Sequence, residues 1–256
     1  MAKTKPTLSE SNAVNDPTKS LQTFDLLDLQ QYTKEKSYST TASKDFHLFY
    51  AGRDDVHNIL KHVLSRVSVS LYLNMFGYDD EELNDIIMQK ALDPSITMVI
   101  TLDKSQAGGV HEKSLLDSDI AKNPSYYNTH FVVGQSATHQ ISHTKGFVAD
   151  GKVGGEGSTN WSSSGEGTFV INGQAGGPNY KAQNNTQSIF TDQDTISRFT
   201  AELIAEHLAA KSQINAAPPT AATPSTAPKA ATSTAAKKAA APKTSAKKAM
   251  KKAAAK

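Results

Sequence analysis

Hydrophobic and polar residues between positions 46 and 103 follow two different periods that alternate along the chain. Two stretches repeat apolar residues every third or fourth position, which predicts helices, and three shorter stretches are rich in β-branched and aromatic residues, which predicts strands. In chain order we expect a strand at 46–51, a helix at 53–67, a strand at 68–76, a helix at 79–93 and a strand at 95–103. This order predicts an α/β domain with some parallel strand pairing and helices packed on the sheet.

The pattern outside this region predicts fewer elements, and it divides the chain into three parts. The further predicted elements are a short helix at 21–32, a helix at about 110–122, strands at 129–136 and 186–192, a glycine-rich loop at 165–181 and a final helix from 194 to about 210. We therefore expect a partly disordered N-terminal extension at 1–44, one folded domain at 45–212 and a tail at 213–256.

The tail differs from the rest of the chain in charge and composition. Residues 216–256 contain nine lysines and no acidic residue, whereas the preceding 215 residues carry 18 basic and 25 acidic side chains, a net charge of −7. Seventeen of these 41 residues are alanine and five are proline. The tail therefore has almost no apolar surface to bury, and we expect it to be disordered when free.

A flexible segment with nine positive charges binds polyanions by releasing their counterions, with little sequence preference. The mixture of lysine, alanine and proline resembles the basic tails of linker-histone-type proteins. We expect the tail to bind nucleic acid. An anionic membrane surface, or a merely solubilising role, is the alternative. The lysines expected to take part include Lys237, Lys238, Lys243, Lys247, Lys248, Lys251 and Lys252.

The sequence also carries indications of the cellular compartment. It has no cysteine, so it has neither disulfides nor thiolate metal sites, which fits a reducing compartment. The first residues lack the apolar run of a secretory signal, and no run approaches the 18 or so apolar residues of a membrane span. We expect a cytoplasmic protein of bacterial type, with association with the nucleoid as one option.

Chemistry-bearing residues are concentrated in the stretch SHTKGFVADGKVGGEGSTNWS, residues 142–162. On a regular strand His143, Lys145 and Phe147 would point to one face, with the first two about 7 Å apart. Such a pair suits one phosphate, with the imidazole as nucleophile and the ammonium as a fixed charge. The glycines at 154, 155 and 157 are expected to form a turn that brings Ser158 and Asn160 to the same place. The alternative is an ordinary hairpin that contains a histidine.

This stretch resembles the HKD motif of the phospholipase D superfamily, because His143-x-Lys145-x4-Asp150 is followed by Gly157-Ser158-Thr159-Asn160. The resemblance implies a phospholipase D-like mixed sheet flanked by helices. It also implies that His143 forms a phosphohistidine intermediate while Lys145, Ser158 and Asn160 hold the phosphate oxygens. Asp150 would be mainly a structural, hydrogen-bonding residue, Gly157 a supporting one, and the chemistry would need neither metal nor cofactor.

Sites of this superfamily use two such motifs, and this chain has one convincing copy. The segment at 111–119 offers His111 and Lys113, but Ser118 stands where the aspartate should be. The resemblance therefore implies a homodimer with a shared site, as in the small bacterial nucleases of the superfamily, since a two-fold axis can bring two copies of His143 together.

The sequence departs from the family pattern after the motif. The family often has an Asn-x-Glu-Asn segment whose glutamate orients the histidine, and here Asn185 and Gln187 are in the nearest register. A glutamine can hydrogen-bond an imidazole, but it carries no charge to stabilise imidazolium. Among other residues, we interpret Trp161 as packing, the acids at 79–82 as a helix start, and His57 and His62 as surface or boundary residues.

These observations lead to one functional hypothesis and two alternatives. The hypothesis is a metal-independent phosphodiesterase that hydrolyses DNA or RNA, with the tail holding the protein on its substrate. The first alternative is a phospholipase D that acts on phospholipid headgroups, for which the tail would bind anionic membranes. The second alternative is a non-catalytic nucleic-acid-binding protein.

Overall fold

The structure is a computed structural model that describes residues 21, 24–106, 128–138, 140–175, 177–178 and 180–215. Several features discussed above lie outside these residues: the N-terminal 20 residues, the predicted helix at 110–122 with His111, Lys113 and Ser118, and the lysine-rich tail.

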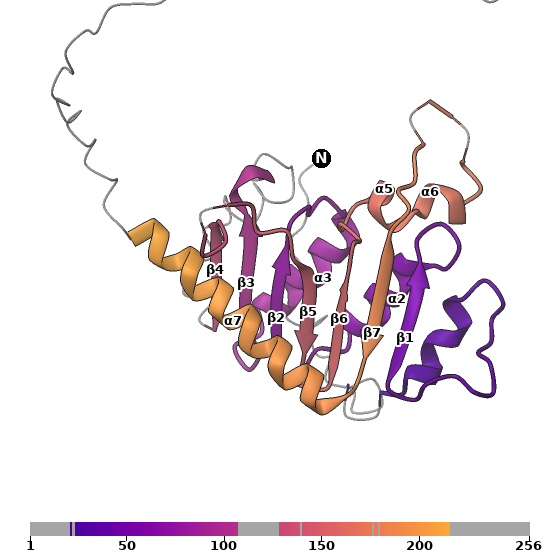
Figure 1. The fold of residues 1–256 in the computed structure, drawn as a ribbon, viewed down its shortest axis with the longest axis horizontal. Coiled ribbons are helices and arrows are strands. Elements are labelled where there is room, and N and C mark those ends of the chain that lie inside the picture. Colours follow the sequence, from indigo (N-terminus) through magenta and orange to yellow (C-terminus); the bar gives the residue numbers. More distant parts are fainter. Residues whose placement is uncertain are drawn as a thin grey trace, which may run out of the picture. The chain divides into compact units, whose positions relative to one another are not determined.

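Seven strands form one mixed sheet in the order β1-β7-β6-β5-β2-β3-β4 (Figure 1). Strands β2, β3 and β4 pair in parallel, and all other neighbours pair antiparallel. The strands are β1 (Phe46–Tyr50), β2 (Ser70–Met75), β3 (Thr97–Asp103), β4 (Thr129–Gly134), β5 (Lys145–Ala149), β6 (Val153–Gly157) and β7 (Thr186–Phe190). The predicted parallel pairing is therefore present. It joins β2 and β3, the strands before and after the predicted helix at 79–93.

Helices cover both faces of this sheet (Figure 1). Helices α2 (Val56–Leu64) and α3 (Glu81–Ala91) lie on one face, and the long helix α7 (Gln193–Asn215) crosses the other. Asp55 caps α2 and Asp80 caps α3, each by accepting a hydrogen bond from a backbone N–H of the first turn. The acidic run at 79–82 is therefore the helix start that the sequence predicted.

The remaining helical segments are short. Within the described residues they are two 3-10 helices, η4 (Leu26–Tyr32) and η5 (Lys104–Gln106), and the single-turn helices α5 (Ser163–Glu166) and α6 (Thr168–Ile171). The predicted helix at 21–32 is therefore a shorter 3-10 helix, and the predicted loop at 165–181 contains α6 and the end of α5. None of the helices in the described part of the chain has the length and hydropathy needed to cross a membrane.

Side chains of the sheet alternate between two hydrophobic cores. Phe147 and Ala149 belong to the main core with α2 and α3, whereas Val148 between them packs under α7. A slip of one residue would exchange these faces, so the pattern of β5 specifies its register. Trp161 is fully buried against Tyr78 and Phe147, as its interpretation as a packing residue requires.

The tight turn of the hairpin is not where the sequence analysis placed it. Gly154, Gly155 and Gly157 belong to strand β6 and do not form a turn. The turn between β5 and β6 is at Asp150 and Gly151, which have φ angles of 53° and 60°. Asp150 and Gly151 are the central residues of a turn closed by the N–H of Lys152 and the carbonyl of Ala149 at 3.0 Å, and Asp-Gly, which accepts positive φ at both positions, was the stronger turn signal.

Candidate active site

The candidate residues gather at one edge of the sheet because neighbouring strands run in opposite directions. Strand β5 begins at Lys145, next to the last residue of β2, Met75, and β6 ends at Gly157 on the other side. The segments that precede β5 and follow β2 and β6 therefore leave the sheet at the same edge. His143 precedes β5, and Ser158 and Asn160 follow β6.

His143 and Lys145 are both in contact with the ring of Phe76, which follows β2. The His143 and Phe76 ring centroids are 4.7 Å apart, and the Lys145 ammonium lies 4.9 Å from the Phe76 centroid. Lys145 also donates a hydrogen bond of 2.8 Å to the carbonyl of His143. An ammonium has three donors, so N–H groups of Lys145 remain for a ligand.

The environments of these two residues differ. Lys145 is 3% exposed, and burial lowers the pKa of its ammonium, an effect that the charge of Glu156 opposes. His143 is exposed and lies before the strand, so the regular strand expected from the sequence begins two residues later. An exposed imidazole beside a buried cation is accessible to an anionic group from solvent.

Asn160 is held at the same edge by pairing between two chain segments. Trp161 donates its backbone N–H to the carbonyl of Gly77 at 2.8 Å, and Asp79 donates to the carbonyl of Trp161 at 2.6 Å. A Cβ on Gly77 would lie 2.9 Å from the side-chain Cγ of Asn160, so a larger residue there would displace the Asn160 side chain. The side-chain oxygen of Asn160 is buried without a hydrogen-bond partner in the described residues. This oxygen accepts hydrogen bonds, so a phosphate oxygen would have to be bound by the amide nitrogen of Asn160.

Ser158 is anchored by its backbone and exposes its hydroxyl group. Its N–H donates to the carbonyl of Thr186, and its Oγ accepts from the N–H of Thr186, both at 3.0 Å. Because Oγ acts as the acceptor there, the hydroxyl proton is free to be donated elsewhere. Gly157 makes this contact feasible, since a Cβ there would lie 2.1 Å from the carbonyl oxygen of Thr186.

Gln187 and Asn185, the two residues in register with the family's Asn-x-Glu-Asn segment, make different contacts. Gln187 is buried and pairs with Gly157 of β6. Its amide nitrogen donates to the carbonyl of Ser188, and its amide oxygen has no hydrogen-bond partner among the described residues. Asn185 donates at 2.9 Å to the carbonyl of Gly165 and so anchors the short helix α5.

Sequence reasoning missed the residues that fix the segment before β5. Ser142 donates its N–H to Asp103 at 2.5 Å and its hydroxyl to Glu206 of α7 at 3.0 Å. Glu206 also accepts from the side chains of Asn74 and Thr144. Asn74 is fully buried within strand β2, and a buried amide on a predicted strand was the signal in the sequence for this network.

Asp150 lies at the other end of β5 from Lys145. Its carboxylate accepts hydrogen bonds of 2.8–3.1 Å from the backbone N–H groups of Ser68, Val69 and Ser70, and one of 2.9 Å from the Ser68 hydroxyl. Asp150 therefore anchors the start of β2 and does not meet the phosphate-binding candidates. These hydrogen bonds are of the kind that the family resemblance implied for Asp150, and its role in the site stays a prediction.

The fold has known counterparts. No protein-family model matches the sequence, and no curated protein sequence matches it significantly. NucT from Helicobacter pylori superposes with a TM-score of 0.50 at 18% identity over 64% of this chain and 96% of that one. Nuc from Salmonella typhimurium, a phospholipase D family member, follows at 0.47 and 12% over 64% and 95%, and phosphatidylserine synthase from Haemophilus influenzae at 0.45 and 12% over 68% and 38%.

The chain therefore has a phospholipase D-like fold, a mixed sheet with helices on both faces. The sequence-based expectation of this fold is confirmed. At this level of identity the likeness concerns the fold.

Replacing Asp150 by asparagine should destabilise the protein by about 2–3 kcal/mol, because asparagine keeps one acceptor oxygen and turns an N–H donor toward other donors. Asparagine tolerates the positive φ at this position, so the backbone conformation is preserved. The free energy of unfolding in urea measures the effect. Asp194→Asn, on the exposed side of α7, is the control and should change stability by less than about 0.5 kcal/mol. Equal stability of Asp150→Asn and wild type would contradict the anchoring role.

Proposed function

We propose that this protein is a phosphodiesterase that hydrolyses nucleic acid through a phosphohistidine intermediate on His143. The observation that supports the proposal most directly is the contact of both His143 and Lys145 with the ring of Phe76, at the sheet edge from which the segment carrying Ser158 and Asn160 departs. The match of these residues to the HKD motif supports the same reaction.

The first half of the reaction is an in-line displacement at phosphorus. The unprotonated imidazole of His143 attacks, an N–P bond forms, and the P–O bond to the leaving oxygen breaks. Lys145 neutralises charge on the non-bridging oxygens, and the Ser158 hydroxyl and the Asn160 amide donate hydrogen bonds to them. The leaving oxygen takes a proton from a second imidazole, which acts as general acid.

The second imidazole comes from a second copy of the chain in this proposal. In a two-fold dimer the same surface meets itself, so His143 of one protomer faces His143 of its partner. After the leaving group departs, the partner's imidazole accepts a proton from water, and the water oxygen displaces His143 from phosphorus. The free histidine and a phosphomonoester result, and both protons are accounted for.

We propose nucleic acid and not phospholipid as the substrate because the chain has a lysine-rich tail. Nine positive charges on an alanine- and proline-rich segment bind a polyanion with strong salt dependence. The mildly acidic remainder of the chain would gain affinity for nucleic acid from such a segment. We also propose that the protein acts in the cytoplasm, where nucleic acid is present.

The His143→Ala variant should lose plasmid nicking by at least about 10³-fold, because it lacks the nucleophile. Supercoiled plasmid is incubated with wild type and variant, in EDTA and in parallel with Mg²⁺, and the open-circular product is followed over time. Wild type should nick at similar rates in both conditions. His130→Ala, at an exposed position of β4, is the matched control and should nick like wild type.

Three results would count against this proposal. Nicking by His143→Ala at the wild-type rate would remove His143 from the reaction, and nicking that requires Mg²⁺ would contradict the metal-independent chemistry. If wild type leaves plasmid and RNA intact but releases phosphatidic acid from phosphatidylcholine vesicles, the substrate is a lipid headgroup.

The shared site predicts a specific result when subunits are mixed. Wild-type and His143→Ala chains are unfolded together and refolded, and nicking is measured against the wild-type fraction. A site that needs both histidines gives activity proportional to the square of that fraction, about one quarter at equal mixing, whereas independent sites give one half. A linear dependence, or an active monomer in light scattering, would contradict the shared site.

Deleting the tail after Asn215 should weaken binding to long DNA and preserve hydrolysis of a small chromogenic phosphodiester. Removing nine lysines also removes the associated counterion release, so the slope of log affinity against log salt should fall steeply. Fluorescence anisotropy with labelled duplex at several salt concentrations measures both quantities. Equal affinity and slope before and after deletion would exclude the tail as a DNA-binding segment.

A further inference from the structure

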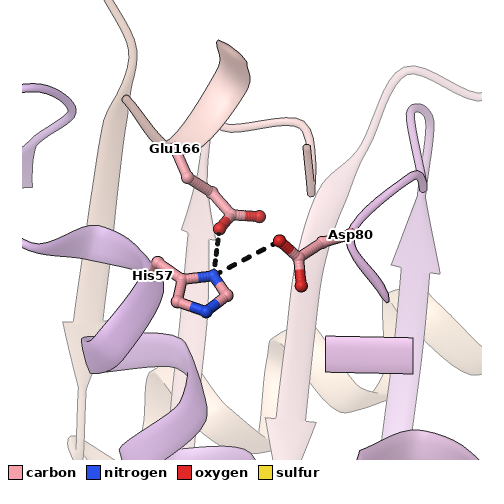
Figure 2. Close-up of side chains that lie close together, drawn as sticks. All are labelled: His57, Asp80 and Glu166. Atoms are coloured by element: carbon pink, nitrogen blue, oxygen red, sulfur yellow. Dashed lines mark hydrogen bonds and ion pairs between the residues drawn. The ribbon is translucent and has the colours of Figure 1, made fainter. Parts of the chain in front are cut away.

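A second polar cluster, separate from the residues of the candidate active site, takes no part in the mechanism above. His57 of α2 points between two carboxylates, Asp80 at the start of α3 and Glu166 at the end of α5 (Figure 2). The ring nitrogen Nδ1 of His57 is 2.6 Å from an oxygen of Glu166 and 3.3 Å from an oxygen of Asp80. The three potential ligand atoms lie within 4.8 Å of one another.

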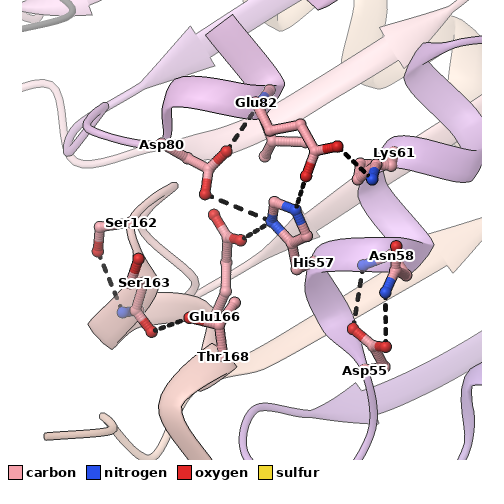
Figure 3. Close-up of polar contacts among 12 residues, drawn as sticks. Asp55, His57, Asn58, Lys61, Asp80, Glu82, Ser162, Ser163, Glu166 and Thr168 are labelled. Atoms are coloured by element: carbon pink, nitrogen blue, oxygen red, sulfur yellow. Dashed lines mark hydrogen bonds and ion pairs between the residues drawn. The ribbon is translucent and has the colours of Figure 1, made fainter. Parts of the chain in front are cut away.

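The other ring nitrogen of His57 is already engaged. Nε2 is 2.9 Å from a carboxylate oxygen of Glu82, whose second oxygen contacts the ammonium of Lys61 at 2.5 Å (Figure 3). A carboxylate can only accept, so Nε2 carries the proton of this hydrogen bond. This arrangement leaves Nδ1 facing Asp80 and Glu166. A histidine that binds a metal through one nitrogen commonly donates the other N–H to a carboxylate in this way.

Glu166 is the residue whose polar surroundings are incomplete. Its side chain is 0% exposed, and its second carboxylate oxygen has no hydrogen-bond partner in the described residues. Burial raises the pKa of Glu166 to about 7, and the charge of Asp80 contributes in the same direction. A buried carboxylate with an unpartnered oxygen beside a second carboxylate has a vacant ligand position that a cation would fill.

We propose that His57, Asp80 and Glu166 form a binding site for one divalent transition-metal ion of the Zn²⁺ or Mn²⁺ type. One imidazole nitrogen with two carboxylates is a donor set that such ions accept, whereas Mg²⁺ and Ca²⁺ prefer oxygen ligands alone. Ligand bonds of about 2.0–2.2 Å require the His57 nitrogen and the Glu166 oxygen to separate to roughly 3 Å. That movement is a few tenths of an ångström.

The competing occupant of the site is a proton. Burial opposes the charging of His57, but hydrogen bonds to Asp80, Glu166 and Glu82 raise its pKa to about 11. A metal must displace the proton from Nδ1, and its affinity is therefore lower at low pH. A bound metal ion would interact with both carboxylates, whereas the single Nδ1–H of His57 is shared between Asp80 and Glu166.

The position of this site indicates a structural role. Asp80 follows the site-forming Gly77 by three residues, and Glu166 follows Asn160 by six, with the backbone pairing of Gly77 and Trp161 between them. An ion bound there would join α2 to the two segments that hold Asn160 without contacting a phosphate. This inference goes beyond the proposed function and does not depend on it.

Direct metal binding tests the inference. Full-length wild type is stripped with a chelator and dialysed against Zn²⁺, and bound metal is measured by mass spectrometry. About one ion per chain is expected, with a melting temperature raised by roughly 5 °C or more at saturating metal. Glu166→Gln and His57→Gln should each lower the affinity at least about 10-fold.

Two control variants separate this site from adventitious binding. Glu202→Gln replaces an exposed carboxylate of α7, and His143→Ala removes the exposed histidine of the candidate active site, so both should bind metal like wild type. Circular dichroism establishes that each variant is folded. Co²⁺ added to wild type gives a second readout that needs no variant, because an imidazole-carboxylate site shows visible d–d absorption that excess Zn²⁺ removes.

The outcomes decide the inference in either direction. Wild type without stoichiometric metal and without a Co²⁺ spectrum would overturn it, and the cluster would then be an imidazolium held by carboxylates. Undiminished binding in a folded Glu166→Gln would overturn it as well. Because binding is measured without substrate, none of these results changes the standing of the phosphodiesterase proposal.

Discussion

The pairing of the segments that follow β2 and β6 is the constraint on which both polar sites depend. Two backbone hydrogen bonds join Trp161 to Gly77 and Asp79, and the fully buried indole of Trp161 holds this pairing against the main core. On one side of the pairing Asn160 reaches the edge of the sheet. On the other side Asp80 and Glu166 meet His57. The candidate active site and the candidate metal site therefore share one piece of backbone.

The sequence predicted the order of strands and helices between 46 and 103, because each element there carries a distinct hydrophobic period. It predicted less around β6, since Gly154 and Gly155 were taken for a turn when they are strand residues lying against large aromatic side chains. A Cβ on Gly154 would lie 2.2 Å from Phe190, and one on Gly155 would lie 2.5 Å from Phe147. Positions 154 and 155 are glycine because side chains from other strands pack against them, and the local sequence pattern does not show such contacts.

The candidate phosphate-binding residues could be named from the sequence because they fall within 18 consecutive positions, from His143 to Asn160. Their supports could not. Phe76 and Glu206 come from segments 67 and 63 positions away from His143, and no spacing rule links them to it. The same reason explains His57, which was interpreted as a surface or boundary residue: its carboxylate partner Glu166 is 109 positions away.

Strand β5 acts as a spacer of fixed length between an anchor and a reactive group. Asp150 attaches one end of the hairpin to the start of β2, and seven positions earlier His143 leaves the other end, about 23 Å away along an extended chain. Lys90 holds the neighbouring backbone with a positive charge. Its buried ammonium donates hydrogen bonds to the carbonyls of Ser65 and Val67, just before the N–H groups that Asp150 binds. The connection between α2 and β2 is therefore hydrogen-bonded first to the Lys90 ammonium and then to the Asp150 carboxylate. Asp150 therefore fixes β5 from the end opposite to Lys145, and the addition or loss of one residue within β5 would turn Lys145 to the opposite face of the sheet.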